Sequence, residues 1–354
     1  MKFLSHTRTE IGFLAIVALY VLVSWLTAFV FNLTAYFHPV MYLDTGIVIT
    51  TTLLIGFVFY LGARCYWIMI FRRPPELARY LWEDLKRGAL KPERYVRALP
   101  IFLGTIFFLS AFTSMKQMIS AIQPFSWDQP LAAIDKLIHF GVDPWRILQP
   151  MLGFPFVTWG INIVYNLWIV GLFLALYWQL FSLKNLQIRM QFFYAFCLSW
   201  AINGTFLAIV FSSAGPCYFE RLVGSAYFEP LMGYLREAST KFFIMAIPTQ
   251  DKLWEAVKNK ETIIGGGISS MPSIHVTTTF LFLLTALKLK TRLWLAFAVF
   301  HVLILLGSVH LAWHYAIDDY FAMLTTFAIW QFSGWLVERL GQRQDLPLLA
   351  PAPD

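Results

Sequence analysis

Long apolar runs recur along the chain and are separated by shorter polar segments. A run of about 17–25 apolar residues is long enough for a helix that crosses a bilayer. The pattern therefore predicts an all-α protein, a polytopic transmembrane helical bundle with about eight spans. The predicted spans are residues 11–31, 47–71, 99–119, 154–183, 190–213, 275–289, 293–313 and 315–337.

The polar segment after the second span has the pattern of an amphipathic helix. Leu77, Tyr80, Leu81 and Leu85 fall on one helical face, and basic residues occupy much of the remainder. This pattern is typical of a helix that lies on an anionic membrane surface.

Two further segments are not predicted to cross the membrane. Residues 120–153 predict a short interfacial helix that carries Asp128, Asp135 and Asp143. Residues 214–272 form the longest non-spanning segment, and a connection of this length is usually functional. We expect it to be an outer loop.

These elements divide the chain into three parts. Residues 1–98 hold two transmembrane helices and the basic interfacial helix, and residues 99–340 form the catalytic membrane core with the outer loop 214–272. Residues 341–354 are expected to be a cytoplasmic tail.

Composition supports a membrane protein, because only 13% of the 354 residues are charged and 58% are hydrophobic. The net charge of +7 is expected in cytoplasmic loops, so it does not indicate nucleic acid as a partner.

Roughly twice as many lysines and arginines lie on the side of the two termini as on the other side. We therefore expect cytoplasmic termini and an integral, multi-pass protein whose active site faces the periplasm or lumen. The short loops and tails favour a bacterial inner membrane.

The polar residues that are suited to catalysis fall into two sets, both on the predicted outer side. Residues 265–275 combine three glycines and three serines with a histidine, His275, at the start of a predicted helix. The second set is His310, His314 and Asp318, which at a spacing of four would share one helical face. Ionisable groups at membrane depth are rare and usually functional.

Together the two sets suggest phosphoryl transfer. Asp318 can hold one ring nitrogen of His314 and leave the other free to attack, while His275 protonates a leaving oxygen. Ser273 and the amides after Gly267 can bind phosphate oxygens. Two histidines and an aspartate could instead bind zinc, but the serine- and glycine-rich context favours phosphate. We expect no metal and no cofactor.

The pattern resembles the type-2 phosphatidic acid phosphatase superfamily. The resemblance rests on Pro272-Ser273-Ile274-His275, followed by His314-Tyr315-Ala316-Ile317-Asp318. Met271 and the preceding Gly215-Pro216-Cys217-Tyr218 are similar to the inositol phosphorylceramide synthase branch. The resemblance implies a six-helix core, with His314 as nucleophile, Asp318 as its orienting group and His275 as general acid and then base. It also implies that Ser273 contacts phosphate.

The sequence departs from the phosphatase pattern at two positions that would supply positive charge. Ser308 stands where phosphatases carry an arginine, and no Lys-x6-Arg-Pro motif precedes the Ser-His segment. The cationic partners of the phosphate are therefore unassigned by the motifs. Arg221 is the first candidate, and His310 is a further candidate for contact with substrate. Asp319 is expected to face away from Asp318, toward solvent or a helix end.

Three functions are compatible with this sequence. The first is a lipid phosphotransferase that moves a head group, such as phosphoinositol, from a phospholipid donor to a lipid acceptor such as ceramide or diacylglycerol. The second is a lipid phosphate or polyprenyl diphosphate phosphatase that uses water at the same site. The third is an inert scaffold or transporter. Retention of both histidines and the aspartate favours an enzyme.

Overall fold

The computed structural model describes residues 2–73, 75–88 and 90–342 of the chain. Every element in these ranges is a helix, which confirms the prediction of an all-helical protein. The long helices are α1 (Lys2–Val30), α2 (Leu43–Phe71), α4 (Pro92–Ile122), α7 (Pro155–Leu180), α8 (Leu186–Ala201), α13 (Ile274–Lys288), α14 (Trp294–His310) and α15 (Ala316–Gln342).

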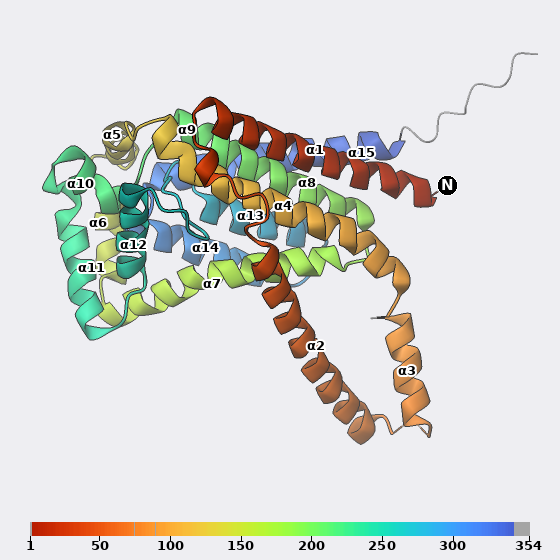
Figure 1. Cartoon of the computed structure of the whole chain (residues 1–354). Coiled ribbons are helices and arrows are strands. Elements are labelled where there is room, and N and C mark those ends of the chain that lie inside the picture. Colours follow the sequence, from red (N-terminus) through yellow and green to blue (C-terminus); the bar gives the residue numbers. More distant parts are fainter. Residues whose placement is uncertain (1, 74, 89, 343–354) are drawn as a thin grey trace, which may run out of the picture.

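All of these except α2 pack side by side in one bundle (Figure 1). Helix α1 packs on α4, α8 packs on α15, and α13 contacts α8, α14 and α15. Helix α8 continues through a π-helical turn, Ile202–Leu207, into the short α9 (Ala208–Val210). Aromatic side chains fill the centre; for example, Phe108 packs edge-on against Phe196 with ring centroids 6.0 Å apart.

A layer of short helices covers one end of the bundle (Figure 1). It consists of α5 (Asp128–Ile138), α6 (Pro144–Leu152), α10 (Phe219–Val223), α11 (Glu229–Lys241) and α12 (Ala246–Asn259). The predicted outer loop 214–272 is therefore largely helical, and residues 120–153 form two helices. Asp128, Asp135 and Asp143 are buried within this layer. We call these helices the cap.

Helix α2 leaves the bundle and meets α3 (Leu77–Arg87) at its far end (Figure 1). Almost all of α2 is exposed, and it is as apolar as the buried helices. The two helices are joined by an ion pair of 2.9 Å between Arg64 and Asp84. Helix α3 includes Leu77, Tyr80, Leu81 and Leu85, the residues predicted to lie on one face of an amphipathic helix.

The number of membrane spans stays a prediction. Among the described residues, five helices are long and apolar enough to cross a membrane, and they coincide with the first five predicted spans. Helices α13 and α14 are apolar but have only 15 and 17 residues. Helix α15 has 27 residues and carries two buried aspartates. The structure thus supports an integral membrane protein. Beyond Gln342, the predicted tail 341–354 lies outside the described residues.

A buried ionic cluster fastens the end of the bundle opposite the cap. The side chain of Arg189 is fully buried and lies 3.5 Å from the carboxylate of Glu10. It also donates hydrogen bonds to the main-chain oxygens of Gln179 (3.0 Å) and Arg97 (2.9 Å). One guanidinium therefore connects α1, α4, α7 and α8.

We expect Arg189→Met to lower the free energy of unfolding by about 3–5 kcal/mol, because it leaves two buried carbonyls without a donor and removes one of the two arginines that pair with Glu10. Thermal unfolding of the detergent-solubilised protein measures this. The control is Arg236→Met, which removes a solvent-exposed ion pair with Glu229 and should cost under about 1 kcal/mol. Equal melting temperatures for the two variants would contradict the structural role of Arg189.

Candidate active site

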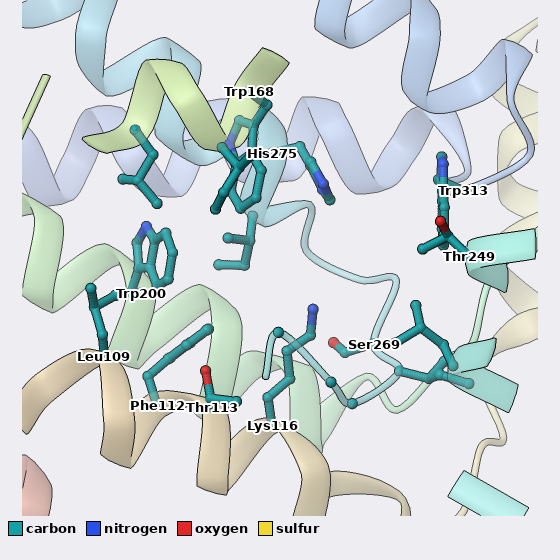
Figure 2. A pocket seen from close by; sticks show the side chains of 18 of the residues that line it. Leu109, Phe112, Thr113, Lys116, Trp168, Trp200, Thr249, Ser269, His275 and Trp313 are labelled. Carbon is teal, nitrogen blue, oxygen red and sulfur yellow. The ribbon is translucent and has the colours of Figure 1, made fainter. Parts of the chain in front are cut away.

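A cavity of about 270 Å³ lies where the bundle meets the cap (Figure 2). Its walls come from α4, α7 and the start of α13, together with the segment 265–269 and the turn before α15. Most of the lining is apolar or aromatic, including Phe112, Trp168 and Trp200. The ionisable side chains on the described wall are Lys116, His275 and His314, with three tyrosines, Tyr42, Tyr165 and Tyr218.

The ring of His314 is fixed by contacts with one of its nitrogens. Nδ1 lies 2.9 Å from the main-chain oxygen of Ser270 and 3.5 Å from Oδ2 of Asp318. Because a carbonyl oxygen only accepts hydrogen bonds, this contact requires the proton on Nδ1 and leaves a lone pair on Nε2. An imidazole whose ring is held in this way can act as a nucleophile through Nε2.

Asp318 is held in place by the start of α15. Its Oδ2 accepts hydrogen bonds from the amide of Tyr315, at 3.0 Å, and from the hydroxyl of Ser270. A carboxylate in the first helical turn that bonds back to the residue before the helix is a stabilising cap. The same oxygen thus serves both the helix and the His314 ring.

His275 approaches from a different helix. It is the second residue of α13, and its ring centroid lies 5.8 Å from that of His314. The ring stacks on Tyr165 at 4.7 Å and contacts Trp168 at 4.3 Å, so α7 fixes its orientation. Two imidazoles from segments about forty residues apart therefore face one cavity, as the sequence predicts.

The structure corrects the expected helical face. Helix α14 ends at His310, and α15 begins only at Ala316. Between them the chain turns through Ala312, whose φ is +61°. His310 and His314 therefore do not share a helix, whereas His314 and Asp318 do meet.

Two of the predicted phosphate-binding residues lie close to one another in sequence but in different surroundings. Gly267 lines the cavity and has φ +89°. Ser273 is fully buried and is the N-cap of α13, where its hydroxyl accepts from the amide of Val276 at 3.4 Å. Ser273 does not line the cavity.

The structure does not bring Arg221 or His310 to the cavity. Arg221 forms an ion pair of 2.6 Å with Asp251 and lies over the ring of Trp254 on the outer face of the cap. His310 is fully buried, and its Nε2 lies 2.9 Å from the hydroxyl of Thr158. Both side chains have protein partners outside the cavity.

Three acidic residues were not recognised as structural parts of the site. Asp128 accepts from the amides of Ala214 and Gly215, at 3.0 and 2.8 Å, and from the hydroxyl of Tyr315. Asp135 accepts from the first two amides of α15, both at 2.9 Å. Helix starts attract carboxylates in this way. Asp319, expected in solvent or at a helix end, is instead fully buried and accepts from the Ser308 hydroxyl.

The sequence analysis did not assign a role to Ser270 or to Lys116. Ser270 stands within the polar stretch, but nothing in the sequence indicates that its carbonyl faces His314. The sequence does indicate a special role for Lys116, because this residue lies inside the apolar run 99–119, where a charge is uncommon.

A profile of the PAP2 superfamily matches residues 129–332, more than half of the chain. The chain belongs to the PAP2 superfamily. Its members are generally phosphatases or phosphotransferases, which is consistent with an enzyme that acts on lipid substrates in a membrane. No curated protein and no solved structure matches the chain significantly. The match includes His275, His314 and Asp318, and it begins after Lys116.

Burial raises the pKa of Asp135 from the ordinary 3.8 to about 6. The folded protein therefore holds this proton more tightly than the unfolded chain does. The contribution of Asp135 to the free energy of unfolding is largest below pH 4. It falls by about 3 kcal/mol as the pH rises through 6.

We expect the melting temperature of the wild type, minus that of Asp135→Asn, to fall between pH 4 and pH 6 and to level off above pH 7. The asparagine does not titrate, so the difference isolates this carboxyl. Thermal unfolding in buffered detergent from pH 4 to 8 measures it. A difference that is constant across this range would contradict the assignment.

Proposed function

We propose that this protein is a membrane lipid phosphotransferase that moves a phosphorylated head group, with phosphoinositol as the preferred candidate, from a phospholipid to a lipid hydroxyl. The observation that carries the proposal is the pairing of His275 and His314 in one largely apolar cavity. The lone pair on Nε2 of His314 is available there, because Nδ1 is occupied by Ser270.

The apolar surroundings support lipid molecules as both donor and acceptor. The cavity shares Tyr42, Leu109 and Phe173 with a neighbouring apolar groove between α2, α4 and α7. The groove is small, about 30 Å³, so it would receive only the part of an acyl chain next to the polar end that reaches the histidines. Ceramide and diacylglycerol both have this form.

The proposed reaction has two steps that balance without an external reactant. Nε2 of His314 attacks the phosphorus of the donor, the bond to the glycerol oxygen breaks, and His275 gives that oxygen a proton. Diacylglycerol leaves, and the head group stays on His314. The acceptor hydroxyl then attacks the same phosphorus, His275 takes its proton, and the bond to Nε2 breaks.

Hydrolysis is the alternative outcome of the same intermediate. A second hollow on the outer side of the segment 265–267 is lined in part by Gln117, Ser120 and Glu261, and Gly267 lines both hollows. Water could therefore replace the acceptor if it passes this segment. The assay below separates the two reactions.

Purified protein would receive phosphatidylinositol labelled in the inositol ring, with and without ceramide or diacylglycerol. A labelled lipid product that requires the acceptor supports transfer, whereas water-soluble inositol phosphate supports hydrolysis. We expect His314→Ala to abolish both products and to remove label bound covalently to the denatured protein. His38→Ala changes a histidine on the loop between α1 and α2 and should keep the activity. Normal turnover by His314→Ala would refute the nucleophile assignment.

We expect Asp318→Asn to lower kcat by roughly 10²-fold. Loss of an orienting aspartate can cost about 10⁴-fold where the wrong tautomer results. Here the Ser270 carbonyl still selects the proton on Nδ1, so the loss should be smaller. Steady-state rates with saturating donor measure this. A complete loss, equal to that of His314→Ala, would show that the carbonyl does not hold the ring.

A further inference from the structure

The outward face of α5 is apolar, although this helix belongs to the cap. Its buried side carries Asp128 and Asp135, whose carboxylates bind main-chain amides beside the active site. Its exposed side carries Pro130, Ile134 and Leu137, which follow one another at helical spacing. The polar and apolar sides of α5 are therefore reversed relative to a helix that covers a protein core and faces water.

Two other cap helices show how this protein builds a surface that meets water. Helix α11 exposes Arg236, Glu237 and Lys241, and α12 exposes Asp251, Lys252, Glu255 and Lys258. Lys136 is the one exposed charged residue of α5, and its ammonium lies over the ring of Tyr227, 5.8 Å from the ring centroid. The face that α5 presents to its surroundings is therefore uncharged, unlike those of α11 and α12.

The apolar face continues into the turn after α5. Phe140 is 99% exposed, and Leu137 is 76% exposed. The amides of Phe140 and Gly141 donate to the carbonyls of Leu137 and Lys136, at 3.3 and 2.8 Å, and Phe140 has φ +58°. Glycine is the usual residue at this point of a helix end, because a side chain there strains the backbone. A strained phenylalanine that packs on nothing within the protein indicates a contact outside the chain.

The turn lies beside the lipid-facing side of the bundle. Nε2 of His139 is 3.0 Å from the hydroxyl of Tyr320, in the second turn of α15. Tyr320 begins a stripe of exposed apolar residues that continues along α15 with Leu324 and Phe327. In an integral membrane protein, such a stripe meets lipid. The apolar turn after α5 extends this stripe at its cap end.

The direction of α5 fits a position along the membrane surface. Figure 1 shows α5 nearly along its axis, whereas the long helices α4, α7 and α15 run across the picture. Helix α5 therefore lies crosswise to the bundle. Because the long helices cross a membrane along its normal, a crosswise helix at their end lies in the plane of the membrane.

We propose that α5 and the turn after it lie in the leaflet on the cap side, at the boundary between head groups and acyl chains, with Leu137 and Phe140 inserted among the lipid molecules. The sequence predicts an interfacial helix within residues 120–153, and the proposal assigns the face and the two side chains that meet lipid. Since Asp128 and Asp135 of the same helix bind the backbone near His314, the leaflet holds the active site at a fixed depth. This inference does not depend on the reaction that the site performs.

Site-specific photo-crosslinking tests the proposal with the full-length protein in phosphatidylcholine vesicles. The variants Leu137→p-benzoylphenylalanine and Phe140→p-benzoylphenylalanine place the photoreactive group at the proposed contact. After illumination, we expect mass spectrometry to find phosphatidylcholine bound to both positions through its acyl chains. The same replacement of Leu324 on the exposed stripe of α15 is the positive control. The same replacement of Lys258, on the charged surface of α12, should give no lipid adduct.

The other outcomes of this experiment overturn the proposal. One is a reaction at Leu324 with no more adduct at the α5 positions than at Lys258, which would place the turn in water. Another is cross-linked dimers in place of lipid adducts, which would make the apolar face a contact between two copies of this chain. The variants at Leu137 and Phe140 should melt at the wild-type temperature, because both side chains point away from the protein. The two positions also give independent readings of the same contact.

Discussion

The contact between the Ser270 carbonyl and Nδ1 of His314 determines the chemistry available to this site. It joins the segment before α13 to the turn before α15, and with the contacts of Ser270 to Trp313 and Asp318 it holds the two histidines at one cavity. It also selects the tautomer, since a carbonyl accepts and cannot donate. Asp318 contributes to the same position through Ser270 and through Nδ1.

The cap helix α5 maintains that contact from outside. Asp128 binds the amides at Ala214 and Gly215, and Asp135 binds the first amides of α15. Both carboxylates satisfy main-chain donors that would otherwise be buried without partners. The cap is therefore more than a cover for the cavity, because it positions the backbone that carries His314.

Hydropathy and residue spacing predicted much of this architecture. The apolar runs predicted the long helices, and the Ser-x-His and His-x3-Asp spacings predicted that His275, His314 and Asp318 belong to one site. These features are local in sequence. The positions of Asp128, Asp135 and Lys116 depend on contacts between segments 86 to 187 residues apart, and no periodicity within a segment encodes them. The break between His310 and His314 was missed because a positive φ at an alanine has no composition signal.

The segment at Gly267 separates two compartments by the width of a single backbone. On one side are the histidines and the apolar groove, and on the other is the hollow at the outer surface of the cap. Since no side chain can be added there without striking Lys116, the thickness of this wall is set by the peptide unit itself. In the proposed reaction, a polar product and a lipid acceptor would lie on opposite faces of the same wall and leave in opposite directions.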